Sequence, residues 1–185
     1  MRVIAGFLGG RTLVAPAGAR TRPTADRVRE ALFSVLAGVE GDAVLDLYAG
    51  TGALGIEALS RGAAHATFVE NARAALQALR QNIHALELGE VTTVLPIAVE
   101  RALRAPPWRE GFDLVFLDPP YAVIRGGRFT DPLAKAVERG LTSSLRPGAR
   151  VILEHTSEEE APPVSGITLE ETRVYGDTSL SFYLR

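Results

Sequence analysis

An acidic residue, two prolines and a tyrosine follow a run of apolar residues in the second half of the chain. The segment FDLVFLDPPY, residues 112–121, predicts a buried strand that ends at Asp118. Pro119 disfavours helical backbone angles at Asp118, and neither proline has an N–H to donate. The Asp118 carboxylate and the Pro119 carbonyl are therefore predicted to form a stiff pair of hydrogen-bond acceptors beside the ring of Tyr121.

This acceptor pair suits a planar group that bears an NH2. Accepting both N–H hydrogens orients the nitrogen and raises its electron density, and the Tyr121 ring can stack on the plane. The nitrogen would then attack the methyl carbon of a sulfonium in line with the C–S bond, so that the sulfur leaves as a thioether, and Asp118 or water would take the proton that the nitrogen loses. Asp118, Pro119 and Tyr121 are the predicted catalytic residues. A structural turn with a surface tyrosine is the alternative for the motif taken alone.

A glycine turn follows another predicted strand, which carries Asp46 near its end. Residues 50–55, GTGALG, match the G-x-G-x-x-G pattern of turns that bind dinucleotides. An aspartate four residues before Gly50 would repel a pyrophosphate and suits a cation instead. S-adenosylmethionine carries an ammonium and a sulfonium and no phosphate, so it is favoured over NAD.

Glu70 ends the next predicted strand. A carboxylate at this place can accept hydrogen bonds from two ribose hydroxyls, which both NAD and S-adenosylmethionine offer. An ordinary surface acid is the alternative for this residue. The predicted donor-binding residues are Asp46, Tyr48, Gly50, Thr51, Gly52, Leu54, Glu70, Asn71, Ala98 and Asp118.

Strand-like and helix-like segments alternate along most of the chain. The predicted strands are residues 43–48, 65–70, 91–96, 112–118 and 149–155, and the predicted helices are 24–38, 53–61, 72–86, 98–104 and 130–140. Near-continuous apolar strands separated by helices indicate a parallel sheet covered on both faces. Runs around Gly9-Gly10 and around Gly176-Asp177 predict β-hairpins, so the sheet is expected to finish with antiparallel strands.

Basic residues gather near the N-terminus, although the whole chain has a net charge of −2. Residues 1–30 hold six arginines against Asp26 and Glu30, a balance of +4. A basic segment on an acidic body predicts contact with nucleic acid, and a solvated surface is the alternative.

A second pair of arginines, Arg125 and Arg128, comes shortly after Tyr121. These residues are candidates for holding the RNA backbone beside the target, and solvated loop charges are the alternative. Gly126-Gly127 between them predicts a mobile lid over the site.

Several classes of protein are disfavoured by composition. The chain has no cysteine, which removes disulfides and thiolate metal sites and fits a cytoplasmic protein. Its three histidines are isolated, so no metal site is predicted. No stretch is apolar enough to predict a membrane span, and the N-terminus predicts no signal peptide.

The Asp46–Gly52 turn, Glu70 and the Asp-Pro-Pro-Tyr motif together resemble a Rossmann-type S-adenosylmethionine-dependent amino-methyltransferase. The N-terminal RVIAGFLGGRTL and TRPTADRVREALFSVL segments are similar to the bacterial 16S rRNA guanine-N2 methyltransferases that act on guanine 966. The resemblance covers nearly the whole chain, including YGDTSLSFY near the C-terminus.

The resemblance implies an α/β fold with a Rossmann-like seven-stranded methyltransferase sheet, its last strand inserted antiparallel. It also implies an assembled or assembling 30S subunit as the partner. The hairpin and charge patterns predict a basic β-hairpin arm at 1–21 beside a methyltransferase domain at 22–185, and the sequence does not give the oligomeric state, for which we expect a monomer. Arg22, Thr24 and Arg27 match the family's N-terminal motif, near the donor or the RNA. The predicted RNA-contacting residues are Arg2, Arg11, Arg20, Arg22, Thr24, Arg27, Arg125 and Arg128.

One departure from related methyltransferases concerns adenine. Many carry Asp or Asn after the third strand, where this chain has Ala98, so backbone groups or apolar contacts are expected to hold adenine instead. Three alternatives remain open: another amino-methyltransferase that acts on adenine N6 or on glutamine N5 of a protein, an NAD-dependent oxidoreductase, and a non-catalytic RNA-binding module.

Overall fold

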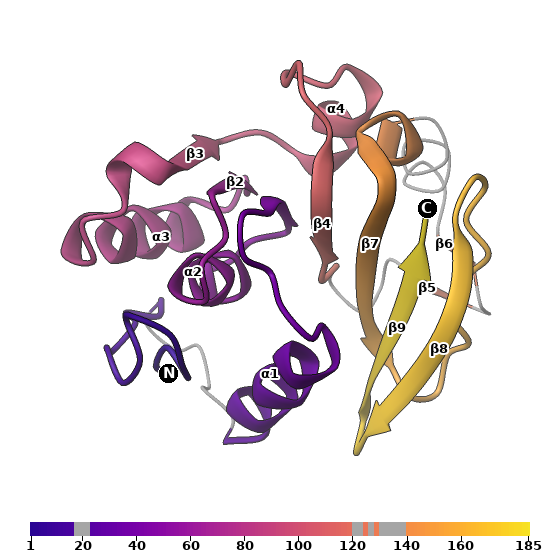
Figure 1. The fold of residues 1–185 in the computed structure, drawn as a ribbon, viewed down its shortest axis with the longest axis horizontal. Helices are drawn as coiled ribbons and strands as arrows, with labels where there is room; N and C mark the ends of the chain where they lie inside the picture. The colour runs from indigo at the N-terminus through magenta and orange to yellow at the C-terminus, as the bar shows by residue number, and fades with distance from the viewer. Residues whose placement is uncertain (17–22, 120–123, 126–127, 130–139) are drawn as a thin grey trace. The chain divides into compact units, whose positions relative to one another are not determined.

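The computed structural model of this chain describes residues 1–16, 23–119, 124–125, 128–129 and 140–185 (Figure 1). The chain divides into two compact units, residues 1–96 and residues 97–185. The first unit includes both the N-terminal basic segment and the predicted donor turn. The predicted boundary between an arm at 1–21 and a domain at 22–185 stays a prediction.

The first unit is built from parallel strands joined by helices. In chain order its elements are α1 (Pro23–Val35), β1 (Ala43–Leu47), α2 (Ala53–Ser60), β2 (His65–Val69), α3 (Arg73–Ala85), the 3-10 turn η1 (Gly89–Val91) and β3 (Thr92–Leu95). β1 pairs with β2 so that Asp46 lies opposite Phe68, and β2 pairs with β3 so that Phe68 lies opposite Val94. Parallel neighbours need a crossover connection, which α2 and the α3–η1 segment provide.

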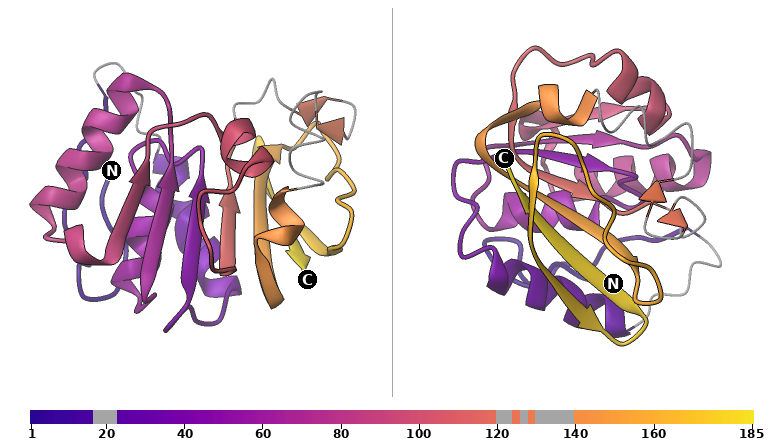
Figure 2. Two further views of the ribbon diagram at one scale, coloured as in Figure 1. Left: turned by 90° about the horizontal axis from the view of Figure 1, so that it is seen from above. Right: turned by 90° about the vertical axis from the view of Figure 1, so that its right-hand side faces the viewer.

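The second unit carries both parallel and antiparallel strands. Its elements are α4 (Val99–Arg104), β4 (Phe112–Leu117), β5 (Ile124–Arg125), β6 (Arg128–Phe129), β7 (Leu145–Thr156), β8 (Thr168–Tyr175) and β9 (Thr178–Leu184). β7 pairs in parallel with β4 and antiparallel with β9, which also pairs antiparallel with β8. The β8–β9 hairpin is seen in Figure 2, and its turn contains Gly176 at φ 65°. The helix predicted at 130–140 lies almost wholly outside the described residues.

Hydrogen bonding orders seven strands as β3-β2-β1-β4-β7-β9-β8. The predicted α/β sheet, mostly parallel with an antiparallel C-terminal hairpin, is confirmed. The parallel strands β1, β2 and β4 are mostly apolar and buried, as expected for strands covered on both faces, whereas β8 is exposed. Leu45 and Phe68 in the first unit and Leu114 and Phe116 in the second are fully buried.

Residues 1–13 form the predicted N-terminal hairpin in a short form. Arg2 and Thr12 make an antiparallel bridge, and the Val3 N–H donates to the Arg11 carbonyl at 2.9 Å. The ladder stops there because the amides that follow Val3 donate to α2 instead. The segment between the two arms is therefore a turn held against a helix.

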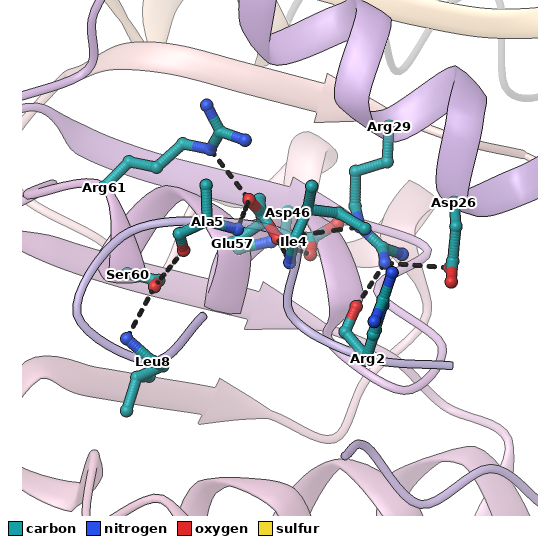
Figure 3. Close-up of polar contacts among 11 residues, drawn as sticks. Arg2, Ile4, Ala5, Leu8, Asp26, Arg29, Asp46, Glu57, Ser60 and Arg61 are labelled. Carbon is teal, nitrogen blue, oxygen red and sulfur yellow. Dashed lines mark hydrogen bonds and ion pairs between the residues drawn. The ribbon is translucent and has the colours of Figure 1, made fainter. Parts of the chain in front are cut away.

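Glu57 on α2, a fully buried acid, binds the backbone of this segment (Figure 3). Its carboxylate accepts hydrogen bonds from the Ile4 and Ala5 N–H groups at 2.6 and 3.0 Å. It also pairs with Arg61 Nε at 2.7 Å and faces Arg29 Nε at 3.8 Å. A buried carboxylate is costly unless it is paired and hydrogen-bonded, so these partners fix the hairpin on α2.

Ser60, one turn further along α2, holds the rest of the turn. Its hydroxyl donates to the Ala5 carbonyl and accepts from the Leu8 N–H at 3.0 Å, and its carbonyl accepts from the Phe7 N–H at 2.9 Å. Gly6 lies so close that a Cβ would be 1.7 Å from the Ser60 carbonyl oxygen. Glycine is thus required here by both contact and a φ of +80°.

Replacing Gly6 by alanine is expected to weaken this docking. The matched control is Gly10→Ala, because Gly10 has a φ of +84° and no atom of the part of the chain that the structure describes lies within 4 Å of the added Cβ. Gly10→Ala should cost only the left-handed strain, about 1 to 2 kcal/mol. Gly6→Ala should cost at least ~1 kcal/mol more, because the added carbon forces the turn off α2. Urea unfolding measures the loss of stability in both variants. Equal losses would show that the close contact between Gly6 and Ser60 does not matter for stability.

Candidate donor and acceptor sites

Asp46 is buried at the end of β1 and is 1% exposed. Its Oδ2 accepts a hydrogen bond from the Gly55 N–H in the first turn of α2 at 2.9 Å. Burial raises its pKa to about 7, the Gly55 hydrogen bond lowers it, and the nearby charge of Glu70 raises it. The structure thus gives Asp46 a role in holding α2 against the strand end, and its attraction for a donor cation stays a prediction.

The turn between β1 and α2 adopts left-handed backbone angles at three residues. Tyr48, Gly50 and Gly52 have φ values of 61°, 57° and 81°. A Cβ on Gly52 would lie 2.4 Å from Leu79 Cδ1, whereas among the described residues one on Gly50 would meet only the Tyr48 carbonyl oxygen, at 3.9 Å. Gly52 therefore lets the turn pack on α3, and Gly50 leaves bare backbone beside open space where a ligand can lie.

Glu70 follows β2 and is half-buried. Its Oε2 accepts from the Gly50 N–H at 2.9 Å, and its Oε1 accepts from the Asn71 and Ala72 N–H groups at 2.8 and 2.7 Å. A carboxylate has about four acceptor positions, and within the described residues these three bonds leave one for a ribose hydroxyl. The carboxylate fastens the donor turn to the start of α3, a role that the sequence did not reveal.

Asn82 on α3 is a second residue that sequence reasoning missed. The side chain is 2% exposed, donates to the Thr51 carbonyl at 3.0 Å, and exchanges hydrogen bonds with the Val14 backbone at 2.7 and 3.0 Å. It therefore joins the donor turn to the N-terminal segment. The available signal was an amide placed between Leu79 and Ile83 on the apolar face of a predicted helix.

The remaining predicted donor residues of the first unit lie around the same turn. Thr51 and Leu54 are half-buried, and Asn71 is exposed at the end of β2. The bare Gly50 backbone, the buried Asp46 and the free acceptor position on Glu70 fit a cationic ligand that carries a ribose. The donor set therefore suits S-adenosylmethionine.

The second unit carries the predicted acceptor residues. Asp118 follows β4 directly and is half-buried, and Pro119 is buried. Ala98 is half-buried at the start of α4, with its carbonyl accepting from the Arg101 and Ala102 N–H groups at 3.0 Å. Their roles toward the substrate amine and adenine stay predictions.

The predicted RNA-contacting arginines have different surroundings. Arg2 and Arg11 are exposed on the hairpin, and Arg27 is exposed on α1, the helix that also contains Thr24. Arg29 differs, because it is 4% exposed and donates to the Asp26 carboxylate at 3.0 Å, so part of the N-terminal charge is structural.

Other predicted contacts lie partly or wholly outside the described residues. Arg125 and Arg128 pair through their backbones in the β5–β6 ribbon. Tyr121, Arg20, Arg22 and the Gly126-Gly127 lid lie outside the described residues.

A comparison with models of known families identifies the family of this chain. The model of the family described as Conserved hypothetical protein 95 matches residues 1–184, which span both units. The chain belongs to this family.

Relatives match over nearly their whole length. The chain is 39% identical over 186 residues to a Bacillus subtilis protein named "Putative rRNA methyltransferase YlbH", covering 99% of this chain and 98% of that protein. It is 37% identical over 188 residues to Escherichia coli "Ribosomal RNA small subunit methyltransferase D", covering 100% and 90%. A solved Escherichia coli structure, "Putative methyltransferase yhhF", superposes with a TM-score of 0.83 at 34% identity and covers 100% and 97%.

These likenesses confirm the class predicted from Asp46, Glu70 and Asp-Pro-Pro-Tyr. This chain is an S-adenosylmethionine-dependent methyltransferase. The oxidoreductase and the non-catalytic module are thereby set aside.

Donor affinity is expected to depend on pH through Asp46. In the free protein its pKa is raised to about 7, and a bound cation favours the ionised form. The affinity for S-adenosylmethionine should therefore rise as the pH goes from about 5.5 through the pKa of about 7, and level off above about pH 8. Asp46→Asn keeps an oxygen acceptor for the Gly55 N–H and should lose this dependence. Titration calorimetry at several pH values tests it, and the same slope in both proteins would contradict it.

Asn82→Ala is expected to loosen the donor turn. Removing the amide leaves the half-buried Thr51 carbonyl and the Val14 N–H without these hydrogen bonds, at about 0.5 to 1.5 kcal/mol each. Affinity for S-adenosylmethionine should fall several-fold, with a loss of stability. Gln81→Ala is the control on the same helix, because Gln81 is exposed. Donor affinity equal to that of wild type would show that Asn82 does not position the turn.

Proposed function

We propose that this protein transfers a methyl group from S-adenosylmethionine to N2 of guanine 966 in 16S rRNA of the small ribosomal subunit. The observation that carries the proposal is the full-length similarity to the Escherichia coli small-subunit rRNA methyltransferase. The donor turn supports it independently, since its residues fit a cationic nucleoside without a phosphate. An enzyme that acts on ribosomal RNA in bacteria works in the cytoplasm.

The first unit holds the donor in this proposal. The backbone at Gly50 lies beneath the ligand, Glu70 accepts a hydrogen bond from the ribose, and the charge of Asp46 favours a cation. S-adenosylmethionine, when bound, supplies a methyl group on a positively charged sulfur. Asp46 and Glu70 together make the electrostatic potential of the site more negative. The site therefore discriminates against nucleotides that carry phosphate.

The second unit holds the acceptor. The Asp118 carboxylate and the Pro119 carbonyl accept the two N–H hydrogens of the guanine amine, which keeps its lone pair free for attack. Proline at 119 has no N–H, so its carbonyl is presented by a backbone with restricted angles. Asp118 or water takes the proton that the nitrogen loses when its new bond to carbon forms.

The guanine amine must leave the RNA helix to be reached. In a duplex it lies in the minor groove, so the target is in a loop or is flipped out at a cost of a few kcal/mol. Exposed Arg2, Arg11 and Arg27 supply positive charge for the phosphates around the target. The partner is an assembled or assembling small subunit, with the protein acting as a monomer.

Asp118→Ala tests the assigned chemistry. Methyl incorporation into undermethylated small subunits should fall by about 100- to 10,000-fold, because the amine loses its principal acceptor. Affinity for S-adenosylmethionine should stay close to that of wild type, as measured by titration calorimetry. Asp177→Ala, an exposed acid in the β8–β9 turn, should retain full activity as the control. Retained transfer by the Asp118 variant, or a defect confined to donor binding, would show the role to be misassigned.

A further inference from the structure

Phe7 is the most exposed large apolar side chain among the residues that the structure describes. It is 71% exposed, compared with 63% for Val174 and 43% for Leu169 on β8. Single exposed apolar residues are common on protein surfaces and alone imply nothing. Phe7 differs in the way the chain holds it.

The backbone around Phe7 is fixed on both sides. The Ala5 N–H donates to buried Glu57, and the Phe7 and Leu8 N–H groups both donate to Ser60. Gly6 is pressed against the Ser60 carbonyl. A buried charge and a close glycine contact thus serve to fix a turn whose aromatic side chain is left in water.

The charge around this aromatic residue favours a nucleic acid. Exposed Arg2 and Arg11 belong to the same hairpin, and residues 1–30 carry a balance of +4. Basic side chains beside an exposed aromatic ring are the elements that bind single-stranded nucleic acid, in which bases stack on the ring and cations hold the backbone. An apolar protein partner would find little apolar area on the hairpin, because its Val3, Leu8 and Leu13 side chains are buried.

We infer that Phe7 is a stacking platform for an unpaired base of the RNA substrate. The inference rests on the proposed function, because it takes RNA as the substrate. Glu57 and Ser60 fix the backbone that carries the ring, so that little backbone ordering entropy is lost when the base binds. Since every base has an aromatic face, this contact adds affinity rather than sequence selectivity.

Equilibrium binding to undermethylated small subunits tests the inference without depending on methyl transfer. Phe7→Ala should weaken binding by about 5- to 150-fold, the range of base–aromatic stacking. Phe7→Trp should bind as well as wild type, and Phe7→Leu, apolar but not aromatic, should resemble Phe7→Ala. Val174→Ala removes another exposed apolar side chain and should bind normally. Donor affinity should be unchanged in all four variants.

Fluorescence supplies a direct readout. The chain has one tryptophan, Trp108, so wild type gives the background for the Phe7→Trp variant. Stacking should quench the added tryptophan when the RNA binds and protect it from iodide. Full binding by Phe7→Leu would instead indicate an apolar protein contact and overturn the inference, as would unaltered binding by Phe7→Ala. Wild-type binding without methyl transfer would refute the proposed function alone, and the Phe7 comparison would still decide the stacking.

Discussion

The turn between β1 and α2 is the constraint on which the rest of the site depends. Gly50 and Gly52 adopt left-handed angles without strain, whereas the left-handed angle at Tyr48 is costly and persists only where the surroundings hold the turn. Three side chains do so: Asp46 bonds the Gly55 N–H, Glu70 bonds the Gly50 N–H, and Asn82 bonds the Thr51 carbonyl. The donor turn is therefore preorganised, and Asp46 and Glu70 each make a structural hydrogen bond in it.

The same first unit ties the N-terminal hairpin to the donor turn. Glu57 and Ser60 lie on α2, the helix that the turn begins, and both hold the hairpin backbone. Asn82 bonds Val14 and Thr51 at once. Because a shared set of buried polar groups serves both segments, displacement of one leaves unpaired groups beside the other. The backbone that carries the exposed arginines of the hairpin is therefore held in place by these hydrogen bonds.

Periodicity and turn chemistry were enough to predict the sheet, the C-terminal hairpin and the donor turn from the sequence. Hydrophobic runs specify strands directly, and Gly50 and Gly176 mark positive φ. The long-range polar contacts were not predictable, because Glu57 and Asn82 bond residues 52 to 68 positions away. Glu70 was assigned to ribose alone, since local sequence does not show that its carboxylate already accepts three backbone N–H groups.

The central claim is that this protein methylates one guanine amine in small-subunit rRNA. The most direct measurement incubates it with undermethylated 30S particles and S-adenosylmethionine labelled in the methyl group, then locates the label by nuclease digestion and mass spectrometry. The account predicts a single N2-methylguanine at position 966. Label on an adenine, on another guanine or on a ribosomal protein would contradict it.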